Sequence, residues 1–124
     1  MGFRPSLALA LGSFALLGSQ PLLAQPTVDP AHQRAANLAR NIGVELNGGL
    51  TKYRPAACMF VIGGGKCLVK TDAKGFLFRF EGGGPGWQEL KKPATSLTEV
   101  LIDPSGRQVV GTPLNKLLSP AKQP

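Results

Sequence analysis

The chain has 124 residues, with 14 Lys and Arg against 7 Asp and Glu, which gives a formal net charge of +7. This length fits one domain and excludes a multidomain protein. Two cysteines are too few for a disulfide-rich scaffold or a four-cysteine zinc site, and a hydrophobic fraction of 43% is too high for a disordered charged chain. The composition therefore predicts a small, basic, folded domain.

Residues 1–24 have the features of a secretory signal peptide. Arg4 precedes an uncharged apolar run over residues 7–17, and Ala24 is a small residue suited to the position before a cleavage site. The run is shorter than the ~20 residues that span a bilayer, and the alternative is a retained N-terminal membrane anchor. Cleavage leaves residues 25–124 as a single small domain, which we expect in the periplasm or outside the cell.

The first element expected after the leader is a helix that begins at Asp29 and Pro30. Asp is a frequent N-cap, and Pro is well tolerated at the first helical position. Asn47-Gly48-Gly49 is a stop signal, because Gly adopts the left-handed conformation that follows many helices. We expect Gly43 to pack closely on a sheet. The apolar residues at helical spacing are Ala31, Ala35, Leu38, Ile42 and Leu46.

Beyond residue 50 the pattern alternates with period two, which is typical of strands. Phe76, Phe78 and Phe80 occupy every second position, and we expect Leu38 and Ile42 of the helix to face Phe78 and Phe80. A turn at residues 72–75 predicts that residues 67–71 pair with residues 77–81.

A second turn, at residues 103–106, predicts that Asp103 pairs with Arg107 and Val100 with Val110. A further strand is expected over residues 56–62. We also expect one helical turn that contains Leu114, Leu117 and Leu118, and a disordered tail over residues 119–124. The predicted fold class is α+β, with one N-terminal helix packed on an antiparallel meander of four to five strands.

Cys58 and Cys67 are the only cysteines, and in an exported chain such a pair predicts a disulfide. A hairpin tight around Gly63–Gly65 would instead place Cys58 opposite Lys70, although a disulfide needs Cα atoms within about 7 Å. Either the glycines form a wider loop, or the cysteines are two buried thiols. The C-x8-C spacing argues against a C-x-x-C redox motif.

The glycine-rich stretch at residues 82–87 is the candidate binding site. Its accessible backbone N–H groups, the indole face of Trp87 and the nearby lysines would suit a ligand with an aromatic or anionic group. The stretch lacks the phosphate-binding loop pattern. The alternative is a tight connection in which Trp87 covers the edge of the core. The site residues proposed from the sequence are Pro85, Gly86, Trp87, Lys91 and Lys92.

Residues with catalytic or metal-binding chemistry are few. His32 is the only histidine, and no serine lies in a G-x-S-x-G motif. We therefore expect no metal, no cofactor and no enzymatic activity. The basic residues form no run of five, and export makes nucleic acid an unexpected partner. The positive charge favours an anionic envelope polymer, lipid head groups or a protein partner, and the alternative is a charge that serves solubility alone.

Several short segments of the chain form a pattern. They are an A-x-N-L-A-R helix that Ala36–Arg40 fits, Asn47–Leu50, Tyr53-Arg54, the Phe-rich strand Gly75–Phe80, and GG-x-PG at Gly82–Gly86. With these segments, residues 35–110 resemble a group of small uncharacterised cyanobacterial proteins, although the cysteines and the leader depart from their pattern. The resemblance implies one domain and a cyanobacterial-like source, and it implies no activity.

Three functions remain open from the sequence. The favoured one is an exported, non-catalytic binding or accessory domain. The alternative is a basic protein associated with the envelope or membrane surface, and a small hydrolase is the third.

Overall fold

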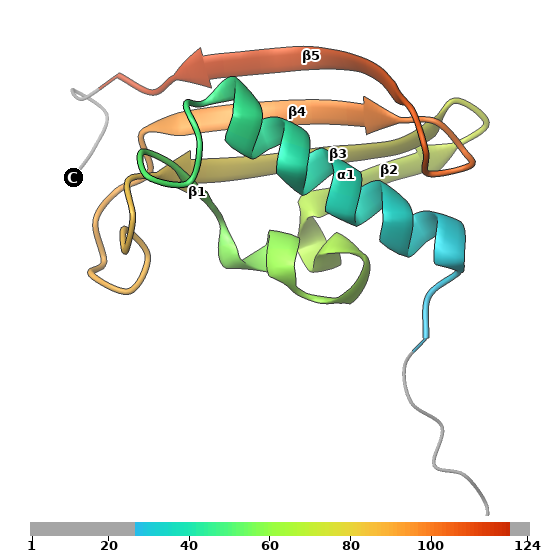
Figure 1. The fold of residues 1–124 in the computed structure, drawn as a ribbon, viewed down its shortest axis with the longest axis horizontal. Coiled ribbons are helices and arrows are strands. Elements are labelled where there is room, and N and C mark those ends of the chain that lie inside the picture. Colours follow the sequence, from blue (N-terminus) through green and yellow to red (C-terminus); the bar gives the residue numbers. More distant parts are fainter. Residues whose placement is uncertain (1–26, 120–124) are drawn as a thin grey trace, which may run out of the picture.

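The computed structural model describes residues 27–119, which form one helix packed against one face of an antiparallel sheet (Figure 1). This arrangement confirms the predicted α+β fold. The expected leader and residues 120–124 of the expected tail lie outside the described residues. The elements are α1 (Pro30–Leu46), β1 (Arg54–Pro55), β2 (Leu68–Asp72), β3 (Gly75–Gly83), β4 (Ser96–Ile102) and β5 (Val109–Leu117).

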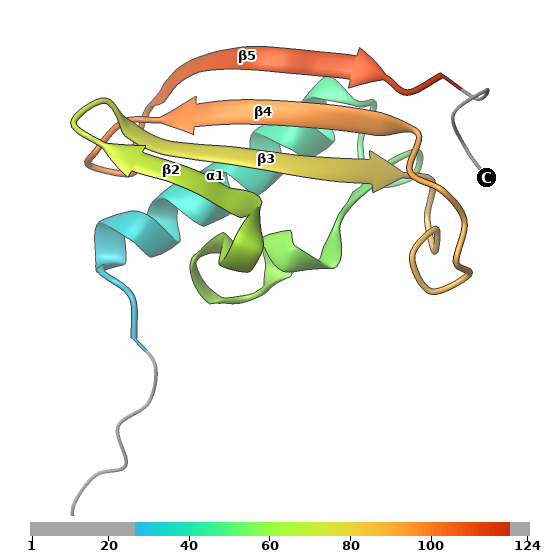
Figure 2. The ribbon, with the colours of Figure 1, turned by 180° about the vertical axis from the view of Figure 1, so that it is seen from behind.

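Strands β2, β3, β4 and β5 form the expected meander, seen from behind in Figure 2. The two-residue strand β1 pairs with Gly82 and Gly83 of β3, whereas β2 pairs with the first half of β3. Strands β1 and β2 therefore share one edge of the sheet, and β5 forms the opposite edge.

Both ends of α1 follow the signals in the sequence. Pro30 is the first helical residue, although the Asp29 side chain makes no capping hydrogen bond. At the other end Gly48 has a φ of +100°, and the Gly49 N–H donates to the Val44 carbonyl at 2.9 Å. This left-handed glycine satisfies the last helical carbonyls and ends the helix.

The core lies between α1 and the phenylalanines of β3, and small residues form the helix face that meets the sheet. Ala35, Ala36 and Ala39 are fully buried with Phe78 and Phe80, whereas Leu38 and Ile42 pack against this core from partly buried positions. A Cβ atom at Gly43 would lie 2.5 Å from the Phe80 ring. The predicted close approach at Gly43 is confirmed, and the closest face of the helix is centred on alanines because they leave room for the rings.

The first hairpin is one residue out of the predicted register. Thr71 pairs with Phe76 instead of Leu77, because Asp72 pairs directly with Gly75 and the loop holds two residues. The Lys74 N–H donates to the Asp72 carboxylate at 2.8 Å, and this hydrogen bond lowers the pKa of Asp72.

The second hairpin departs further from the prediction. The Asp103 N–H bonds to the Gln108 carbonyl, so Asp103 does not pair with Arg107. Val100 does not pair with Val110, because a bulge shifts the register until Glu99 faces Leu114. The predicted helical turn near the C-terminus is also wrong. Strand β5 continues to Leu117 as an extended edge strand, with Pro113 inside the shifted stretch.

The predicted strand over residues 56–62 is wrong as well. A 3-10 helix, η1 (Ala57–Phe60), and a kinked segment of tight turns, η2 (Ile62–Cys67), replace it. The three glycines of η2, Gly63–Gly65, all have positive φ, which folds the chain back on itself. A Cβ atom at Gly64 would lie 2.7 Å from the Phe78 ring, so this segment packs on the core only as glycine.

The folded-back path brings the two cysteines close enough to bond. Cys58 and Cys67 form a disulfide with a Cα separation of 5.7 Å, which lies within the range such a bond spans. A flat hairpin would have separated the two residues, whereas the turns of η1 and η2 bring them together. A bond of this kind is typical of proteins that fold in an oxidising compartment.

Candidate functional site

Trp87 is buried and does not offer an open stacking face. Its side chain is 8% exposed, packs with Ala56 and Ala94, and donates from Nε1 to the Arg54 carbonyl at 2.9 Å. The expected aromatic platform at this residue is therefore wrong, and the alternative, in which Trp87 covers the edge of the core, describes the structure.

The two lysines of the predicted site shape the end of the same loop. The Lys92 N–H donates to the Trp87 carbonyl at 2.8 Å and the Lys91 N–H to the Gln88 carbonyl at 3.0 Å. Lys91 has a φ of +58°, which makes this a helix-type C-terminal cap with Lys in the usual glycine position. Both lysine side chains are exposed.

An open hollow of about 560 Å³ lies beside this loop. Gly86 and Trp87 of the predicted site line this hollow, whereas Pro85 and the two lysines do not. The hollow lies between the loop and the segment around η1. Its lining residues are Arg54, Pro55, Ala57, Phe60, Gly86, Trp87, Gln88 and Glu89.

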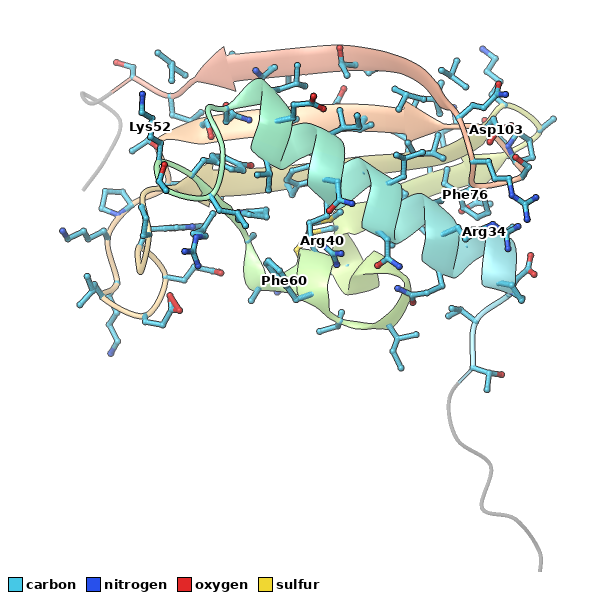
Figure 3. All side chains as sticks on the ribbon, in the orientation of Figure 1. Arg34, Arg40, Lys52, Phe60, Phe76 and Asp103 are labelled. Carbon is cyan, nitrogen blue, oxygen red and sulfur yellow. A yellow bond between two sulfur atoms is a disulfide. The ribbon has the colours of Figure 1, made fainter. Side chains whose placement is uncertain are left out.

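Phe60 is the exposed aromatic residue of this surface. It lines the first hollow and also a second one of about 490 Å³, which it shares with Arg40, Val44 and Leu50. The Arg40 guanidinium lies 5.3 Å from the centre of the Phe60 ring (Figure 3) and donates to the Met59 carbonyl at 3.3 Å. The ring therefore stands between two hollows with a cation held over it.

Phe60 belongs to three consecutive exposed apolar residues, which we call the Phe60 knob: Phe60, Val61 and Ile62. Their exposed fractions are 58%, 50% and 59%. The knob lies where η1 meets η2, and the ribbon of this segment, between β1 and β2, extends beyond the sheet edge that those strands form (Figures 1 and 2). Exposed apolar residues this close together mark an interaction surface more often than scattered ones do.

The knob is held in place from several sides. The disulfide joins η1 to η2. The Gly63 N–H donates to the Gln33 side chain at 2.7 Å, and His32 Nε2 lies 2.8 Å from the Gly63 carbonyl. Because a carbonyl accepts only, His32 must carry a proton on Nε2. The His32 ring also stacks on Phe76, so this histidine fixes structure under the knob.

Cations surround the knob. Arg40 lies over Phe60, Arg54 lines the first hollow, and Lys66 lines a third hollow together with Val61. Arg54 donates from Nε to the Leu50 carbonyl at 2.9 Å. Within residues 27–119, the carboxylate salt bridges join Lys70 to Asp72 and Arg79 to Glu99, so neither of them involves Arg40, Arg54 or Lys66. The guanidinium groups near Phe60 are thus held by carbonyls and stay available to an anion.

Tyr53 is the other buried group with chemistry of its own. Its hydroxyl makes no hydrogen bond of good geometry within the described chain. Burial raises the pKa of Tyr53 to about 12, and the neighbouring hydroxyl groups of Thr98 and Ser96 oppose only part of that rise. A phenol that stays neutral and closed to solvent has a packing role.

Over residues 27–119, no helix is long and apolar enough to cross a bilayer. The same residues contain no group of three or more His, Cys, Asp or Glu side chains placed to hold a metal ion.

Comparison of the chain with protein-family models, with curated proteins and with solved structures finds no significant match.

Proposed function

We propose that this chain is an exported, non-catalytic binding domain that attaches to the cell envelope through the Phe60 knob. The observation that carries the proposal is the exposed Phe60 ring between two hollows, with Arg40 over it. A large apolar side chain in water is unfavourable, and aromatic residues together with Arg are enriched where proteins bind partners.

Export is supported by the features of residues 1–24 and by the disulfide. The excess of basic residues supports an anionic envelope component as the partner. The loop with Gly86 and Trp87 forms one wall of the site, and Lys91 and Lys92, at the end of that loop, add positive charge near it.

Fractionation of cells tests this function. The protein, expressed with its own leader, is expected in the envelope fraction and to be released by high salt. The double substitution Phe60→Ser and Ile62→Ser should move it to the soluble exported fraction. A matched control replaces Val110 and Leu117, exposed apolar residues of β5 on the opposite sheet edge. Equal retention of both double variants would contradict the proposal, as would an intact protein confined to the cytosol.

A further inference from the structure

The Phe60 knob has the chemistry of a membrane-inserting loop. Its three apolar side chains are each at least half exposed, and cationic residues of neighbouring segments line the hollows beside Phe60. Proteins that lie on a bilayer place apolar residues below the head groups and Lys or Arg at the level of the phosphates. From this arrangement we infer that the knob inserts into an anionic lipid surface, an inference that rests on the proposed envelope function.

Charge complementarity favours lipid phosphate as the occupant. Arg40, Arg54 and Lys66 border the knob, and their neighbours in the same hollows include the carboxylates Glu81 and Glu89. Two further cations, Lys91 and Lys92, follow in the adjoining loop, so cations exceed carboxylates around the knob. Each cation near an anionic bilayer strengthens binding about fivefold.

The adjoining loop extends the apolar part of this edge. Leu90 is among the most exposed large apolar residues, and it lies against Gly86, which lines the hollow shared with Phe60. Two separate segments thus present apolar side chains at one edge of the sheet, each accompanied by basic residues. A small ligand would need only one deep pocket. Two separate apolar segments are better suited to a broad, flat partner such as a lipid surface.

Vesicle sedimentation tests the inference on protein purified as the cell exports it. The vesicles contain equal parts of phosphatidylglycerol and phosphatidylcholine, and the comparison vesicles contain phosphatidylcholine alone. We expect sedimentation with the anionic vesicles only, weakened by high salt. The Phe60→Ser and Ile62→Ser double variant should bind at least about tenfold more weakly, and the Val110→Ser and Leu117→Ser control within about twofold of wild type.

The arginine over the ring provides a second, independent variant. Arg40→Gln should weaken binding about fivefold, whereas Arg40→Lys keeps the charge and should restore most of it. The emission of Trp87, the only tryptophan in the chain, shows that each variant is folded. A nitroxide on the upper part of the lipid chain should quench Trp87, because Trp87 lines the same hollow as Phe60.

The outcomes separate the two proposals. Absence of binding to both kinds of vesicle overturns the lipid inference. If retention in cells still depends on Phe60, the partner is an envelope protein or polymer, and the proposed function stands. Equal binding to both kinds of vesicle overturns the role given to the lipid charge. If the test variants remain in the envelope fraction as the wild-type protein does, both proposals are overturned.

Discussion

Removal of the disulfide should destabilise the domain and loosen the Phe60 knob. Cys58 and Cys67 are separated by nine positions in the sequence, and a cross-link over a loop of that length stabilises a fold by about 2.7 kcal/mol on the chain-entropy relation. This is a large share of the roughly 5–15 kcal/mol that such domains possess.

Urea unfolding of the oxidised protein, the reduced protein and the Cys58→Ala and Cys67→Ala double variant measures the effect. The reduced protein keeps both sulfur atoms, so it isolates the bond from the packing of Cys67, which is buried. We expect the midpoint of the reduced protein to fall by more than about 1 M urea. A reduced protein that unfolds at the same urea concentration as the oxidised one would refute the reasoning.

Two further predictions concern single residues. Tyr53 is the only tyrosine, so the ultraviolet absorbance of its phenolate should titrate near pH 12. Folding raises the pKa of Tyr53 from 10.0 to about 12. The free energy of unfolding is therefore unaffected by this group below pH 10, and it falls by about 3 kcal/mol as the pH rises through 12. A Tyr53→Phe variant should lack that loss, and a midpoint near 10 would show an accessible phenol instead. Lys91→Gly should stabilise the domain by up to about 1 kcal/mol, because Lys91 has a φ of +58°, and thermal unfolding that shows a lower midpoint would contradict this.

The sequence was most informative where one local signal decides a structure. Pro30 and Gly48 fixed the ends of α1, and alternation identified β3. The hairpin registers differ from the predicted ones because a register depends on how many residues the turn contains. The pairing of Asp72 with Gly75 decides that number in the first hairpin, and the Asp103–Gln108 hydrogen bond decides it in the second.

The site was harder to predict, because exposure depends on distant parts of the chain. A Phe-Val-Ile run reads as a buried strand, and only the path of the three glycines after it turns Phe60 and Ile62 outward. Trp87, which was expected at the surface, is buried instead, and its indole N–H donates to the carbonyl of Arg54, 33 positions earlier. No spacing in the sequence shows either contact.

Photo-crosslinking in living cells tests the central claim, that the Phe60 knob is the binding surface. Benzoylphenylalanine is incorporated at position 60 in one strain and at position 117 in another. Leu117 is 82% exposed on the opposite edge of the sheet, so it is a matched control. The account predicts light-dependent adducts with envelope components from position 60 and none from position 117. Adducts from position 117 alone, or from both positions alike, would contradict it.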